Sequence, residues 1–270
     1  MIAELPSNLQ GDVALGMAQA AGAVALCLVV VALCRRFGVH AEREAVLSLA
    51  RGLVQMVAVG IVLALLLKGT LLIGALILLG MTVAAALTAS RRARNVPGSL
   101  TLCFWAIFAG SATVITAMLA SRSLQANVAT LVPVGSMIIA NAMNSCAQAA
   151  ERFRSDVSGH VGAIETSLAL GADPKVAVAP YLQSAVYASL LPRLDMLKSL
   201  GLVWIPGVMA GMMVSGASPV YAGIFQFIVV AMILAASGIT GLLTTLLLRQ
   251  RAFTAAAQLA LRPERLAAVP

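Results

Sequence analysis

The sequence predicts an all-α protein, a polytopic transmembrane helical bundle of about seven spans that forms one domain over residues 1–270. Hydrophobic residues make up 61% of the chain and charged residues only 10%, more apolar surface than a soluble domain can bury. Several apolar runs have the ~20 residues that cross a bilayer core of ~30 Å as helices. Strict alternation is absent, and lipid requires helices or closed barrels, so we expect helices.

The apolar runs place the spans in order along the chain. The predicted spans cover approximately residues 13–34, 45–67, 71–89, 100–120, 131–150, 200–215 and 220–248. The acidic start and the long first run argue against a cleavable signal peptide. A charged segment at about 151–199 separates the fifth and sixth spans, and we expect it to leave the bilayer.

The net charge of +8 comes from arginines that lie between the apolar runs, which indicates membrane topology and not nucleic-acid binding. One set of alternate loops contains most of the basic residues: Arg35, Arg36, Arg43, Arg91, Arg92, Arg94, Arg152, Arg154, Lys175, Arg193, Lys198, Arg249, Arg251, Arg262 and Arg265. The other set contains only Lys68 and Arg122. Basic loops stay in the cytoplasm, so we expect an outside N-terminus and a cytoplasmic C-terminus.

The charged segment has the pattern of a helix–turn–helix. Its first helix is amphipathic, with apolar residues at three- and four-residue spacing: Val157, Val161, Ile164 and Leu168. Gly171 suits a helix C′ position, Asp173 an N-cap, and Pro174 the first helical position. The second helix should run toward Leu191, with a kink at Pro180.

Two resemblances start from this segment. Glu165 to Gly171 (ETSLALG) resembles in part the E-A-A-x-x-x-G loop with which importer permeases of the ABC class dock on their ATPase. A closer resemblance covers about residues 45–251 and includes RxxxQ at Arg51–Gln55, NAM at 141–143, ERFRSD at 151–156, LALGADPKVA at 168–177, LLPRLDMLKSLGLVWIPGVMAGMM at 190–213 and SPVYAGIFQ at 218–226. This closer resemblance is to the Fet-type ABC permeases, the bacterial iron-efflux family that also includes plant aluminium-tolerance half-transporters.

That resemblance implies a permease of the bacterial inner membrane, a homodimer that pairs with a separate ABC ATPase and exports a metal ion such as iron. It assigns ATPase coupling to one stretch: Glu165, Leu168, Gly171, Ala172, Asp173 and Pro174. The chain has no G-x-x-x-x-G-K-[ST], so we expect ATP and Mg²⁺ in the partner subunit and no cofactor in this chain. We also expect no catalytic residues here.

Polar residues at membrane depth are candidates for a substrate pathway. Asn141, Asn144 and Gln148 lie three to four residues apart, so they share one helical face. Such a row could line a pathway, or it could make hydrogen bonds between helices, and both interpretations stay open. Gln55, within the resemblance, is a further candidate for the pathway.

The sixth predicted span contains thioethers and possible breaks. Met209 and Met213 could contact a soft metal, although methionine is also common apolar filler. Pro206 and Gly207 should kink or break the span, and Gly207 with Gly211 allows close helix packing.

Other charged residues have structural interpretations. Arg51 could snorkel from the second span or contact substrate, and Asp195 with Lys198 could form an ion pair near a gate. The isolated histidines argue against a histidine metal site, and the metal ligands stay unknown. The four cysteines contain no CxxC pair, which favours buried structural thiols over metal ligands.

Two other function classes fit the composition. An ion-coupled secondary transporter would work alone, but no predicted span has the central carboxylate that proton coupling usually needs. A membrane scaffold would recruit a soluble enzyme without moving any solute. The substrate stays open between iron, another metal and a nucleotide sugar.

Overall fold

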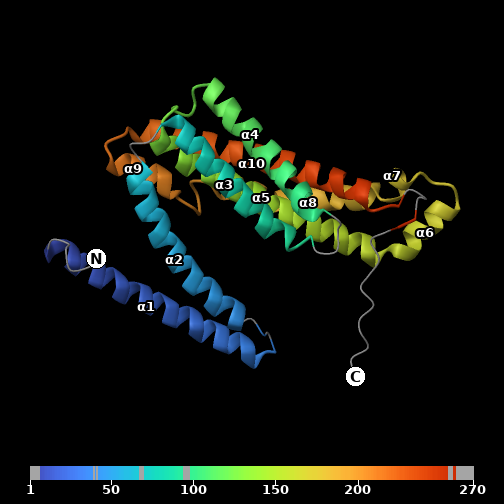
Figure 1. The fold of residues 1–270 in the computed structure, drawn as a ribbon, viewed down its shortest axis with the longest axis horizontal. Helices are drawn as coiled ribbons and strands as arrows, with labels where there is room; N and C mark the ends of the chain where they lie inside the picture. Colours follow the sequence, from blue (N-terminus) through green and yellow to red (C-terminus); the bar gives the residue numbers. More distant parts are fainter. Residues whose placement is uncertain are drawn as a thin grey trace. The chain divides into compact units, whose positions relative to one another are not determined.

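The computed structural model describes residues 7–38, 40, 42–66, 70–93, 98–254 and 258–259, without the side chains of 7–14 and 61–66. These residues form helices (Figure 1): α1 (Ser7–Arg36), α2 (Glu42–Leu66), α3 (Leu71–Ser90), α4 (Ser99–Ala120), α5 (Val128–Gly159), α6 (Val161–Ala169), α7 (Pro174–Ala177), α8 (Ala179–Ser199), α9 (Gly207–Val214) and α10 (Pro219–Arg251). No strand is present within these described ranges, which confirms the all-α prediction.

The chain divides into two compact units, Met1–Leu67 and Lys68–Pro270. The first unit contains α1 and α2, which pack on each other. Arg35 Nε and Glu42 Oε1 lie 3.3 Å apart and join the end of α1 to the start of α2. The prediction of one domain over the whole chain stays a prediction.

The second unit is a bundle built around α5 and α10. α5 packs against α3, α4, α8 and α10, while α10 also packs against α4, α8 and α9. Small residues let these helices approach closely. A Cβ added at Gly110 of α4 would lie 3.0 Å from Ala236 O of α10, and one at Gly135 of α5 would lie 2.9 Å from Leu78 Cδ1 of α3.

Five described helices are long and apolar enough to cross a membrane: Leu15–Arg36, Leu71–Ser90, Ser99–Ala120, Val128–Gly159 and Pro219–Arg251. They correspond to the first, third, fourth, fifth and seventh predicted spans. The second predicted span falls on α2, which is not among the five. The chain is therefore a multi-pass membrane protein, and a total of seven spans stays a prediction.

The sixth predicted span, at 200–215, is wrong as a single helix. The backbone is irregular from Leu200 to Pro206, with Gly201 at φ +76°, and α9 has only 8 residues. At 1.5 Å per residue, α9 is about 12 Å long and cannot cross a bilayer core of ~30 Å. The break occurs where Pro206 and Gly207 predicted one.

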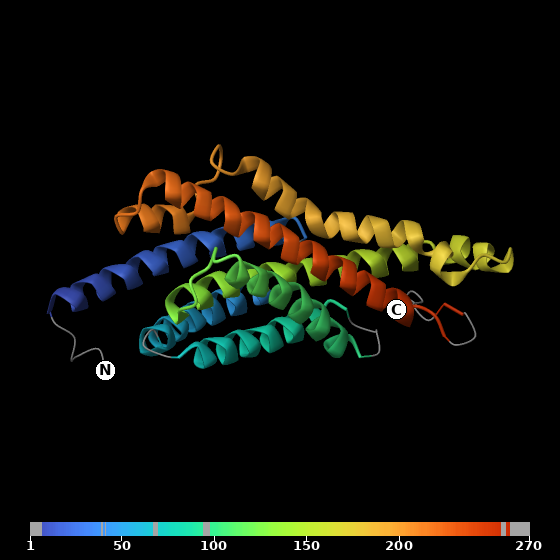
Figure 2. The ribbon, with the colours of Figure 1, turned by 90° about the horizontal axis from the view of Figure 1, so that it is seen from above.

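The segment at 151–199 is also more integrated than we expected. α5 continues to Gly159 because Phe153 and Val157 are fully buried. α8 packs along α5 and α10, as Figure 2 shows, and the Ser145 hydroxyl of α5 donates to Ser189 O of α8 over 3.3 Å. Only α6 and α7 project beyond this bundle, at the opposite end from α9 (Figures 1 and 2). We call α6, α7 and the turn between them the elbow.

Candidate functional site

The turn of the elbow has the local chemistry that the sequence predicts. Gly171 has φ +88° and occupies C′ of α6, where its N–H donates to Leu168 O over 3.0 Å. The N–H of Ala172 donates to Ser167 O over 3.0 Å, which completes a Schellman motif. Asp173 then caps α7, since its Oδ1 accepts from the Lys175 N–H over 2.7 Å, and Pro174 is the first residue of α7. The turn is therefore fixed by short-range hydrogen bonds.

The elbow presents apolar side chains to the surroundings. Leu170 is 85% exposed and Val176 is 65% exposed, on either side of the turn. Glu165 and Asp173 are also exposed, whereas Leu168 is half-buried and packs against the core. Sequence reasoning selected Leu168 but missed Leu170 and Val176, because periodicity marks the buried face of a helix and not its exposed tip.

Contacts at the base hold the elbow on the bundle. Ile164 of α6 is buried, and the rings of His160 and Tyr181 stack with their centroids 5.0 Å apart. Arg152 Nε lies 3.0 Å from Asp156 Oδ2 on α5 and donates to Ser184 Oγ of α8 over 3.4 Å. A force on α6 and α7 would therefore reach both α5 and α8.

The predicted pathway residues of α5 do not converge on one site. Asn141 Nδ2 donates to Met137 O of its own helix over 2.7 Å, and Asn144 is exposed. The Gln148 Oε1 atom is buried and has no hydrogen-bond partner in the described chain. The three residues do share one face of α5, as their spacing predicts.

The residues proposed near a gate and in the sixth predicted span agree with the predictions only in part. Asp195 Oδ1 and Lys198 Nζ lie 3.3 Å apart, which confirms the predicted pair, although both side chains are exposed. Pro206 is buried, and Met213 is exposed while Met209 is half-buried. A Cβ added at Gly207 or Gly211 would meet no described atom within 4 Å, so this glycine pair packs against none of the described helices.

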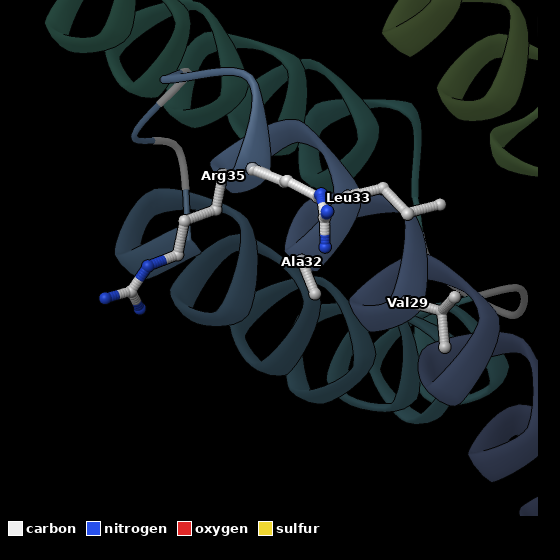
Figure 3. Close-up of a pocket in the computed structure, with 5 residues that line it drawn as sticks. Val29, Ala32, Leu33 and Arg35 are labelled. Atoms are coloured by element: carbon white, nitrogen blue, oxygen red, sulfur yellow. The ribbon is translucent and has the colours of Figure 1, made fainter.

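Arg51 and Gln55 both lie exposed on α2 in the first unit. The same unit has an open depression of about 500 Å³ along the last turns of α1 (Figure 3), lined by Val29, Ala32, Leu33, Arg35 and Arg36. Its charged groups are arginines, and Arg35 already pairs with Glu42. The depression is therefore a face of one helix without converging ligand groups.

A more enclosed pocket of about 350 Å³ lies in the second unit, between the α4–α5 connection and the starts of α5, α9 and α10. We call it the end pocket, because it lies at the α9 end of the bundle. Its polar lining comes from Arg122, Ser123, Gln125, Thr130 and Tyr221, and its apolar lining from Leu124, Ala129, Pro133, Val134, Met137, Val208, Met212 and Phe225. The sequence did not predict this pocket, because four separated segments form it.

The lining of the end pocket has no carboxylate, thiol or imidazole. More broadly, the described residues contain no group of three His, Cys, Asp or Glu side chains that could hold a metal ion. The four cysteines are all free, with Cys103 and Cys146 buried between helices.

Comparison with known proteins explains this combination of helices and motifs. The family described as "Uncharacterised protein family (UPF0014)" matches residues 17–253. This chain belongs to that family. No solved structure matches the chain.

Three relatives show the range of the UPF0014 family. The UPF0014 membrane protein STAR2 of Oryza sativa subsp. japonica is 33% identical over 90% of this chain and 86% of the relative. Protein ALUMINUM SENSITIVE 3 of Arabidopsis thaliana is 30% identical over 90% of each chain. The Probable iron export permease protein FetB of Escherichia coli is 28% identical over 88% of this chain and 93% of the relative. The resemblance to Fet-type permeases is thus confirmed at the level of the family.

Proposed function

We propose that this chain is the membrane-spanning permease subunit of an ABC exporter, and that a separate ATPase subunit docks on the elbow. The observation that carries the proposal is the exposed apolar tip, Leu170 and Val176, on a turn fixed by its own hydrogen bonds. Exposed apolar side chains beyond a membrane bundle favour a protein partner. ATP and Mg²⁺ would bind the partner, and the permease would work as a homodimer because ABC ATPases act in pairs.

The charge distribution supports a cytoplasmic elbow. Arg92 Nη1 lies 3.3 Å from Glu151 Oε2, and Arg251 Nη1 donates to Gly98 O over 2.6 Å. The end of α3, the start of α4, the late part of α5 and the end of α10 therefore meet on the elbow side. Basic residues gather there, as expected for the cytoplasmic side of an inner-membrane protein.

Iron is the proposed cargo because a relative is named as a probable iron export permease. The elbow transmits force in this proposal: ATP-driven closure of the partner moves α6, and the contacts of Arg152 and Ile164 pass that movement to α5 and α8. The bundle then alternates between inward-open and outward-open states.

The test is co-purification of this chain, in nanodiscs, with candidate ABC ATPase subunits from the same genome. Leu170→Asp and Val176→Asp should each abolish co-purification while leaving the thermal stability of the permease unchanged, because both side chains are exposed. Val214→Asp is the matched control, since Val214 is 90% exposed at the other end of the bundle.

Retained ATPase binding in both elbow variants would contradict the proposal. Flux measurements separate the other function classes. Transport driven by a pH jump without ATP would indicate a secondary transporter, and ATPase recruitment without any solute flux would indicate a scaffold.

A further inference from the structure

The end pocket has an electrostatic character that does not suit a bare metal ion. Arg122 is the one side chain of fixed charge among the residues that line it, and that charge is positive. Hard cations such as Mg²⁺ and Ca²⁺ are bound by several oxygen ligands, usually with carboxylates, whereas the side-chain oxygens here are neutral hydroxyls and an amide. The Met137 and Met212 thioethers are soft ligands, but Arg122 would repel a cation beside them.

Arg122 is held in an unusual backbone conformation at the mouth of the pocket. Its φ is +55°, and it is the one non-glycine residue with positive φ in the described chain. It follows the C-cap of α4, and its N–H donates to Leu119 O over 3.1 Å. A long cationic side chain at a position that favours glycine indicates that the charge has a use there.

Gln226 is a buried polar residue that follows a pocket residue in the sequence of α10. The pocket residue is Phe225, and Gln226 itself is only 2% exposed. Neither its Nε2 nor its Oε1 atom has a hydrogen-bond partner among the described residues. An unpartnered buried amide is destabilising, so its presence within an apolar helix indicates a partner that arrives with a ligand or a movement.

We infer that the end pocket binds an organic anion with an apolar body, such as a carboxylate or a phosphate monoester on an aromatic or alkyl group. Arg122 pairs with the anionic group, and Tyr221, Phe225 and Met137 contact the apolar body. The Gln226 amide makes a second polar contact when a movement of α10 brings it to the ligand. This inference deepens the proposed function, on which it rests for the transport step. The organic anion would be the carrier of the exported metal.

The first experiment measures equilibrium binding of radiolabelled phenyl phosphate to the full chain in nanodiscs of phosphatidylcholine, with empty nanodiscs as background. We expect saturable binding that is at least about tenfold tighter than binding of inorganic phosphate, because the latter lacks the apolar body. Arg122→Gly should weaken binding about tenfold or more, since it removes the charge and suits the positive φ. Arg122→Lys should keep most of the affinity.

Gln226→Leu separates a binding role from a structural one. It should weaken phenyl phosphate binding several-fold while leaving the melting temperature equal or higher, because it removes an unpartnered amide from an apolar core. If the Gln226 amide instead stabilised the fold, Gln226→Leu would lower the melting temperature. Arg91→Gln, an exposed arginine outside the pocket, is the matched control and should change neither property.

Absence of saturable binding, or equal affinity in wild type and Arg122→Gly, would overturn the inference. Saturable Fe²⁺ binding without phenyl phosphate, lost on Met137→Leu or Met212→Leu, would overturn it in favour of a metal site. Each of these results would leave ATPase co-purification through the elbow untouched, so a failure of the pocket and a failure of the proposed function are distinguishable.

Discussion

At the scale of single residues, Gly171 determines where the elbow turns. A residue with a Cβ at φ +88° has less favourable contacts with its own backbone, and the two hydrogen bonds of the Schellman motif require this conformation. The sequence predicted this turn because Gly, Asp and Pro act through contacts over a few residues. These short-range contacts do not depend on how the helices pack, so the sequence alone is enough to predict them.

We therefore predict that Gly171→Ala destabilises the elbow by about 1 kcal/mol. Hydrogen exchange of the amides in α6 and α7 should become several-fold faster, and ATPase co-purification should weaken. Gly162→Ala is the matched control on the same elbow, because Gly162 lies inside α6 and a Cβ there would meet no described atom within 4 Å. In Gly162→Ala, hydrogen exchange should be as slow as in the wild type or slower. Faster exchange in Gly162→Ala but not in Gly171→Ala would contradict this account of the turn.

At the scale of helices, close approach of α4 and α10 depends on Gly110. A Cβ at this position would overlap the Thr240 hydroxyl oxygen and lie 3.0 Å from Ala236 O. Thr240 Oγ1 is itself buried without a hydrogen-bond partner in the described chain. At Gly110, α4 and α10 are thus packed too tightly for an added Cβ.

Gly110→Ala should consequently lower the stability of the bundle by about 1–3 kcal/mol, the usual result of overpacking. The measurement is thermal unfolding in detergent, with Gly80→Ala on α3 as the control, because a Cβ at Gly80 would meet no described atom within 4 Å. Adding Thr240→Ala to Gly110→Ala should restore part of the loss, since it removes the overlapping hydroxyl. If the stability effects of the two substitutions simply add, Thr240 is not the contact that causes the loss of stability.

The helices differ in how well the sequence predicted them. Five apolar runs became long helices, because length and hydropathy alone define a membrane-spanning helix, although α5 continues nine residues beyond the predicted end of its span. α8 was predicted to lie outside the bundle because it falls within the charged segment at 151–199. The structure buries Ala185 and Ser189 of α8 against α5 and α10, a pattern of small residues that hydropathy does not detect.

Sites formed by distant segments were harder to predict than turns. The end pocket combines residues from four segments, so only the packed bundle reveals it. Two signals were present in the sequence: Arg122 is one of two basic residues on its side, and Gln226 is a lone amide in the apolar run IFQFIVV. Neither signal indicates which residues lie next to it in the fold, so the predicted pathway was placed on residues of α2, α5 and α9 instead.

At the scale of the whole molecule, the elbow and the end pocket lie at opposite ends of one bundle, so they should face opposite sides of the membrane. α5 and α10 contain 32 and 33 residues, which at 1.5 Å per residue gives each a length of about 50 Å, more than a bilayer core of ~30 Å. Positive residues gather at the elbow end, so that end should be cytoplasmic and the pocket should open outside.

Single cysteines introduced into a variant without the four native cysteines test this orientation. Ala126→Cys, at an exposed position beside the end pocket, should react with a membrane-impermeant maleimide in intact cells. Lys175→Cys, exposed on the elbow, should react only after the cells are made permeable. The reverse pattern would place the elbow outside, where no ATPase driven by cytoplasmic ATP could reach it, and would refute the proposed exporter. Labelling of both sites in intact cells would mean that the elbow and the pocket share the outer side, which a bundle that spans the bilayer does not allow.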